Sequence, residues 1–171
     1  LSQVAALTVL PVPPNITSQP VSRMINDGDN VSFTVTATGT APLSYQWARN
    51  AVSILGATSD TLNLNGASLG SSGGYTVVIT NSAGSVTSQV AVLTVQAVAP
   101  LILTQPVSRT VDEGTNVSFT VSVTGTAPLS YQWARNASNL LTETIAALTL
   151  RNVSLGASGS YTVGITNFAG S

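Results

Sequence analysis

The feature that most constrains the fold of this 171-residue chain is a repeat with a period of 86 residues. Residues 38–51 recur without change as residues 124–137. Residues 15–85 align with residues 101–171 without a gap, with 45 identities in 71 positions. A repeat of this length is typical of one small folding unit duplicated in tandem. We therefore expect two domains of the same fold.

The same offset relates the first ten residues to a later segment. Residues 3–5 and 7–9 match residues 89–91 and 93–95. The second copy, by contrast, reaches Ser171 without a counterpart of residues 86–95. The expected organisation is an orphan strand with its linker, a complete domain, and a domain that lacks its last strand, at residues 1–14, 15–96 and 97–171.

The secondary structure is predicted from an alternation of apolar and polar residues. Val31, Phe33 and Val35 alternate with Ser and Thr, which is typical of half-buried strands. Gly, Pro and Asp separate such runs, and several short strands at this spacing favour an all-β sandwich. Residues 52–58 are compatible with a short further strand, but their different sequence in the two copies favours a loop. The predicted strands of the first copy are residues 16–24, 30–38, 43–49, 60–65, 74–81 and 86–95, and all but the last recur 86 residues later.

The composition excludes several functional classes. The chain has five Arg but no Lys, His or Cys, and only 6% of its residues are charged. A nucleic-acid interface needs a basic surface, and Ser–His–Asp or Cys–His catalysis and thiolate or imidazole metal sites need the missing residues. No apolar run approaches the roughly 20 residues that span a bilayer. We therefore expect no enzyme activity, cofactor, metal, nucleic-acid partner or membrane insertion.

A few polar or aromatic positions have both a ligand-binding and a structural interpretation. Residues 27–30 (Asp-Gly-Asp-Asn) resemble a calcium loop, but the acids move in the second copy, which favours a turn. Arg49 and Arg135 are interpreted as solvated charges at strand ends rather than as ligand contacts. Tyr45 and Tyr131 precede a Trp by two residues, which favours the core over a sugar-stacking surface.

Asn-x-Ser/Thr sequons make glycan decoration an open question. The Ser and Thr side chains are also candidate acceptors, and neither sequons nor hydroxyls identify a ligand. The five sequons begin at Asn15, Asn30, Asn116, Asn136 and Asn152.

Both copies carry a motif that resembles immunoglobulin-like domains of the I-set type. In the first copy the motif runs from Gly28-x-x-Val31-x-Phe33-x-Val35 through Trp47 and Leu62-x-Leu64 to Gly73-x-Tyr75-x-Val77. The repeated sequence Gly-Thr-Ala-Pro-Leu-Ser-Tyr-Gln-Trp is similar to that of tandem domains in long secreted or surface-attached bacterial proteins. The resemblance implies that Trp47 and Trp133 are buried and that Tyr75 and Tyr161 form tyrosine corners.

The chain departs from that family at its disulfide. The resemblance places Val35 with Val77, and Val121 with Val163, where the family has a Cys pair. A disulfide of this loop size contributes up to about 4 kcal/mol, whereas each buried Val contributes about 1.5–3 kcal/mol. A sandwich held by packing is therefore expected. Ser71 and Ala157 also replace the acidic residue of the family before the corner Tyr.

The unmatched strands predict how the chain assembles. Four linker residues reach at most about 14 Å, too short for residues 1–10 to pass the first domain and reach the second. We therefore expect Val4, Ala5, Leu7 and Val9 to complete another copy, or the next repeat of a longer chain. The expected role is a structural repeat of an extracellular or cell-surface fibre, filament or stalk. The alternative is an adhesin or a spacer or binding module, carbohydrate-associated or not.

Overall fold

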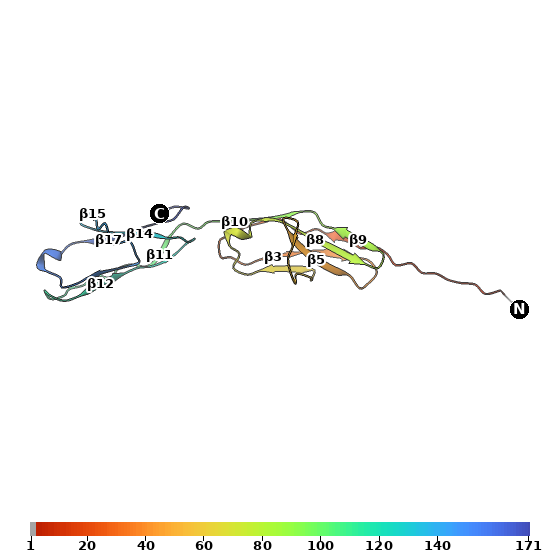
Figure 1. Cartoon of the computed structure of the whole chain (residues 1–171), viewed down its shortest axis with the longest axis horizontal. Coiled ribbons are helices and arrows are strands. Elements are labelled where there is room, and N and C mark those ends of the chain that lie inside the picture. The colour runs from red at the N-terminus through yellow and green to blue at the C-terminus, as the bar shows by residue number, and fades with distance from the viewer. Residues whose placement is uncertain (1–2) are drawn as a thin grey trace. The chain divides into compact units, whose positions relative to one another are not determined.

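The computed structural model describes residues 3–171, and the chain divides into a first unit, Leu1–Gln96, and a second unit, Ala97–Ser171. The expected all-β class is confirmed, since the only helices of the described residues are two single 3-10 turns, η1 (Leu69–Ser71) and η2 (Leu155–Ala157). Residues 1 and 2, part of the expected orphan strand, lie outside the description. Figure 1 shows the strands of each unit arranged as a sandwich.

The first unit builds two layers from ten strands. One layer is a six-stranded sheet in the order β2-β10-β8-β5-β6, with β9 also paired to β8, and the other contains the pairs β1-β4 and β3-β7. The strands are β1 (Asn15–Ser18), β2 (Arg23–Asn26), β3 (Val31–Thr34), β4 (Thr36–Thr38), β5 (Ser44–Arg49), β6 (Val52–Ser53), β7 (Thr61–Leu64), β8 (Gly73–Asn81), β9 (Gly84–Thr87) and β10 (Ala91–Gln96).

The second unit repeats this arrangement with fewer strands. Its described residues form the pairs β11-β13 and β12-β16 and a three-stranded sheet β15-β14-β17. The strands are β11 (Leu101–Thr104), β12 (Val117–Thr120), β13 (Ser122–Thr124), β14 (Ser130–Arg135), β15 (Ser138–Asn139), β16 (Ala147–Leu150) and β17 (Tyr161–Thr166).

The alternating residues supply the core between the layers. In the first unit Phe33, Trp47, Tyr75, Val77 and others are buried, as part of a cluster of eleven buried residues. Tyr75 stacks on Phe33 with 4.9 Å between ring centroids. Trp133, Val121, Leu148 and Ile165 form the corresponding buried cluster of the second unit.

Three predicted strands of the first copy were wrong because each is interrupted, and the two of them that recur in the second copy are shortened or divided as well. The predicted strand 16–24 divides at Gln19-Pro20, where Pro20 lacks the amide that a ladder needs. As a result β1 pairs with β4 in one layer and β2 pairs with β10 in the other. The predicted strand 102–110 is likewise limited to β11.

The other two interruptions occur where an amide or a side chain bonds outside the ladder. The predicted strand 30–38 divides at Val35, whose amide donates to the carbonyl of Asp60 at 3.0 Å. The predicted strand 86–95 divides at Ser88, whose hydroxyl turns inward to accept the amide of Val77 at 3.0 Å. The expected loop 52–58 begins with the short edge strand β6.

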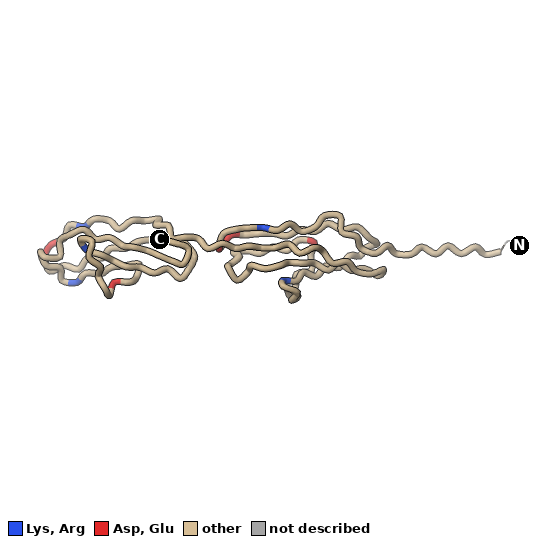
Figure 2. Tube along the Cα trace, turned by 90° about the horizontal axis from the view of Figure 1, so that it is seen from above, with Lys and Arg blue, Asp and Glu red and all other residues tan. Residues whose placement is uncertain are grey.

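Charged side chains are sparse on both units, as Figure 2 shows. Among the described residues no group of three or more acidic, His or Cys side chains is placed to hold a metal ion. The description of residues 3–171 contains no helix of the length and apolar character that a membrane span requires.

Candidate functional site

The two units differ most at the position of β10, which closes the first sandwich. This strand pairs in parallel with β2, where Leu93 lies opposite Arg23, and antiparallel with β8, where Ala91 lies opposite Tyr75. Ala91, Leu93 and Val95 point inward and are at most 7% exposed. The strand therefore joins two others and contributes three core side chains.

Side chains at both edges of β10 bind its amides where the ladder is incomplete. Ser22 immediately precedes β2, and Ser72 immediately precedes β8, so the two hydroxyls accept amides from opposite sides of the strand. The Gln19 side chain, three residues before Ser22, accepts a further amide. The amides of Gln89, Val92 and Val95 donate to Gln19 Oε1, Ser22 Oγ and Ser72 Oγ at 2.9, 2.9 and 3.0 Å.

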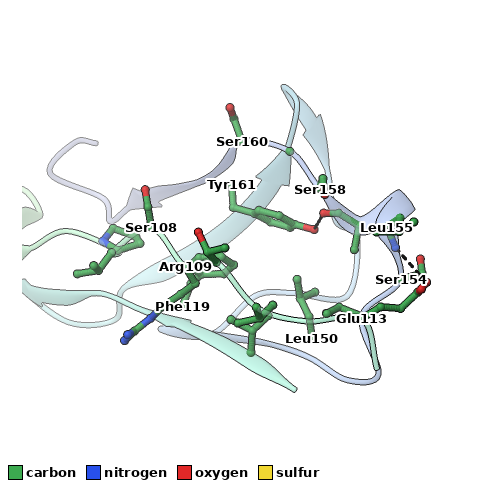
Figure 3. Close-up of a pocket in the computed structure, with 18 residues that line it drawn as sticks. Ser108, Arg109, Glu113, Phe119, Leu150, Ser154, Leu155, Ser158, Ser160 and Tyr161 are labelled. Atoms are coloured by element: carbon green, nitrogen blue, oxygen red, sulfur yellow. Dashed lines mark hydrogen bonds between the residues drawn. The ribbon is translucent and has the colours of Figure 1, made fainter. Parts of the chain in front are cut away.

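The second unit has an open groove at the equivalent place, and we call it the strand groove. Among the described residues β17 pairs with β14 alone, so its other edge has no strand. The groove has a volume of about 530 Å³. Figure 3 shows Phe119, Leu150 and Tyr161 along it, with Ser108 and Ser158 also lining it. An edge of this kind is a template for an added strand.

The open edge leaves the surrounding core less buried than in the first unit. Tyr75, Val77 and Phe33 are at most 1% exposed, whereas Tyr161, Val163 and Phe119 are only partly buried. The Tyr161 hydroxyl still donates to the carbonyl of Ala157 at 2.7 Å. The tyrosine is therefore held in place while one side of its ring faces the groove.

One wall of the strand groove lacks the strand that its sequence would allow. Residues 109–112 correspond to β2, but they form no strand in the second unit. In the first unit Ile25 packs against the core, whereas its counterpart Val111 is 45% exposed. Because β2 pairs only with β10 in the first unit, the missing pairing partner accounts for this difference.

The predicted assembly strand lies unpaired at the other end of the chain. Residues 3–10 form no secondary structure and leave the first sandwich as a single trace (Figure 1). Val4, Leu7 and Val9 are 97%, 89% and 82% exposed. Three large apolar side chains of this segment are therefore exposed.

A polar clamp, not predicted from the sequence, holds the entry to each sandwich. The Asn81 side chain donates to the carbonyls of Val12 and Thr40 at 2.7 and 2.9 Å, and the Val12 amide donates to Thr40 Oγ1. Asn167, Val98 and Thr126 make the same bonds in the second unit. The repetition of both Asn and Thr at an offset of 86 is the sequence signal for this clamp.

Comparison with known proteins identifies the fold family. Residues 13–81 and 99–167 each match the family model of the immunoglobulin domain. The chain belongs to the immunoglobulin domain family. The immunoglobulin domains 1–5 of Sidekick-1 share the fold, with 23% identity, a TM-score of 0.57, and coverage of 92% of this chain and 37% of that one. Titin domains z1z2 in complex with telethonin give 23% identity and a TM-score of 0.54, with 93% and 91% covered.

The curated relatives are much longer than this pair of immunoglobulin domains. Endoglucanase C of Cellulomonas fimi is 32% identical over 120 residues, which cover 68% of this chain and 11% of that protein. Human Kin of IRRE-like protein 1 is 28% identical over 151 residues, which cover 88% and 20%. The chain thus spans a fifth or less of either relative, so neither protein's activity transfers to it.

The immunoglobulin-family positions have structural contacts. Trp47 and Trp133 are fully buried, and their indole nitrogens donate to the carbonyls of Ser59 and Ile145. Val35 and Val77 are both buried where the resemblance implied a Cys pair. In the second domain Val121 is buried and Val163 partly so.

The remaining candidates of the sequence also hold the immunoglobulin fold together. Asp29 accepts the amide of Asn26 within its own turn, and Asp27 accepts the amide of Leu69 in η1. Arg49 donates to the carbonyl of Gly70, and Arg135 to those of Gly156 and Ser158, so both brace a 3-10 turn instead of being free charges at strand ends. Tyr45 and Tyr131 pack against their cores.

The sequons differ in how far their side chains are already bonded. Asn30, Asn116 and Asn136 each accept a backbone amide. Asn15 lies on β1 with an exposed side chain, and Asn152 is exposed as well.

Proposed function

We propose that this chain is a structural repeat unit of an extracellular fibre, filament or stalk, joined head to tail by strand complementation. In this proposal residues 1–10 of one copy, of which 3–10 are described, occupy the strand groove of another copy. The observation that carries it is an identity of inward residues. Ala5, Leu7 and Val9 repeat the core residues Ala91, Leu93 and Val95 of β10.

The clamp supports the same geometry. Val98 is clamped three residues after Val95, and Val12 is clamped three residues after Val9. The donated strand would therefore be separated from the first sandwich of its own chain by the same number of residues that separates β10 from the second sandwich. The junction between copies would reproduce the covalent junction within each chain.

The contact surfaces set the form of the assembly. The strand groove and residues 3–10 are different surfaces of one chain, so the contact between copies is heterologous. Heterologous contacts that do not close a ring produce open filaments. Burial of Leu7 and Val9 contributes about 1.5–3 kcal/mol each to this contact.

Concentration-dependent assembly tests the proposal. Sedimentation velocity of the intact chain is expected to show growing oligomers, and electron micrographs are expected to show fibres. Leu7→Asp places a charge at the inward position and is expected to leave monomers. Thr8→Asp is the matched control, because the corresponding Thr94 is exposed on β10. Monomers at all concentrations, or equal assembly of the two variants, would contradict the proposal.

A second candidate is a spacer or binding module within a longer secreted or surface protein, including one that acts on carbohydrate. The similarity to part of Endoglucanase C favours it. In that case the strand groove is filled by residues that continue the same chain. The parent polypeptide would then remain monomeric, with the edge of β17 protected from hydrogen exchange.

A further inference from the structure

We infer that Gln105, Ser108 and Ser158 form a register site, which selects the alignment of the strand that enters the strand groove. These residues lie 86 positions after Gln19, Ser22 and Ser72, the side chains that accept the amides of β10. The inference rests on the proposed function, because the strand is taken to be residues 3–10 of a second copy.

The three side-chain oxygens of the register site, Gln105 Oε1, Ser108 Oγ and Ser158 Oγ, accept no hydrogen bond from the described residues of their own chain. Ser108 and Ser158 both line the groove, on its two sides in Figure 3. By analogy with the first unit, Ser108 receives an amide next to residues 109–112 and Ser158 receives one next to β17.

The offset of 86 assigns the amides that bind there. Gln3, Ala6 and Val9 correspond to Gln89, Val92 and Val95, so their amides would donate to Gln105, Ser108 and Ser158. In this alignment Ala5 lies opposite Tyr161 and Leu7 opposite Gly159, as Ala91 and Leu93 lie opposite Tyr75 and Gly73.

Apolar alternation alone does not select this alignment. A shift by one residue turns every inward side chain outward, but a shift by two keeps the alternation. The register site rejects one of the two shifted alignments, and the core rejects the other. A shift by two in one direction places Pro11, which has no amide proton, at Ser158 and pushes Leu7 against Tyr161.

The opposite shift leaves a cavity instead. It moves Ala5 to the position of Leu93, so an alanine occupies a space that a leucine fills in the first unit. It also moves Leu7 to the position of Val95. Only the assigned alignment satisfies both the core and the three acceptors.

Disulfide trapping between two full-length chains tests the register. Because the sequence has no native Cys, only the introduced cysteines can form a disulfide. Val92 lies opposite Gly74, so Ala6→Cys in one chain should pair with Ser160→Cys in the other. Thr8→Cys and Val4→Cys report the two alignments shifted by two residues. With an affinity tag on one chain, the mixed dimer is counted on non-reducing gels.

The expected result is at least about tenfold more mixed dimer for Ala6→Cys than for either shifted cysteine. Ser108→Ala with Ser158→Ala in the accepting chain should reduce the preference over Thr8→Cys by roughly a factor of two to ten, because the assigned alignment then loses the Ser158 bond that Pro11 cannot make. The preference over Val4→Cys should persist, because it depends on the core. Ser154→Ala is the matched control, since Ser154 lines the groove but its counterpart Ser68 does not bind β10.

The outcomes separate the two proposals. Equal trapping at all three cysteines, or an unchanged preference over Thr8→Cys after the double alanine substitution, overturns the register site and leaves strand complementation standing. No mixed dimer from any pair of folded chains overturns strand complementation itself. Folding of each variant is checked by the emission of its buried Trp residues.

Discussion

Removing one inward side chain of β10 should weaken the first sandwich substantially. Leu93 is 1% exposed and packs in the core with Tyr75 and Val77. A buried Leu→Ala substitution costs about 2–5 kcal/mol, from lost burial and from the cavity that remains. A domain of this size has a free energy of unfolding of about 4–12 kcal/mol. Leu93→Ala should therefore remove about a sixth of that stability at the least, and most of it at the upper end of these ranges.

Urea unfolding followed by Trp fluorescence measures this loss. The chain has two Trp, one in each core, so a Trp133→Phe background leaves Trp47 as the only reporter. With a urea dependence of about 1–3 kcal/mol per M, Leu93→Ala should lower the midpoint by about 1 M or more. Val92→Ala is the control on the same strand, since Val92 is 48% exposed.

The reasoning fails if the two substitutions shift the midpoint equally. That result would mean that the first sandwich does not depend on the inward face of β10. The same inward pattern in residues 3–10 would then have no energetic value for strand complementation.

Three other outcomes are expected. Tyr75→Phe removes the 2.7 Å bond to the Ser71 carbonyl and should lower the free energy of unfolding by about 1 kcal/mol, measured in the same urea assay. Asn167→Ala removes two hydrogen bonds of the clamp and should lower the free energy of unfolding of the second domain by about 1–3 kcal/mol. Phe168→Ala, at a 67% exposed position, should change the same free energy by less than about 0.5 kcal/mol. Hydrogen exchange of residues 109–112 should be fast in dilute monomers and slow after assembly, and equal exchange in both states would contradict strand pairing there.

Sequence patterns predicted the central strands well because each is a short, uninterrupted alternation. The predicted strands 43–49, 60–65 and 74–81 correspond to β5, β7 and β8 within one residue at each end. Two other strands, 30–38 and 86–95, were predicted too long because their interruptions depend on tertiary contacts. The amide of Val35, for example, leaves its ladder for Asp60, a residue distant in sequence.

The candidate site was predicted in part for the same reason. The inward residues of the assembly strand follow from alternation and from the offset of 86. The polar side chains that accept the amides of β10 do not, because Gln19, Ser22 and Ser72 are recognisable only once β10 lies beside them. Repetition marks them as shared by both units, but it does not say what they bind.

The two units form a matched pair that separates the effect of the strand from the effect of the sequence. The same Phe, Tyr and Val residues surround β10 in the first unit and the strand groove in the second. The centroids of the stacked Phe and Tyr rings are 4.9 Å apart in the first unit and 5.1 Å apart in the second. The greater exposure of Tyr161 therefore reflects the absent neighbour and not a different packing. A groove whose aromatic floor is already in place needs little reorganisation to bind a strand. In the proposed assembly, the ordering would fall mainly on residues 3–10 and 109–112, which form no strand in this structure although their counterparts 89–96 and 23–26 lie along β10 and β2.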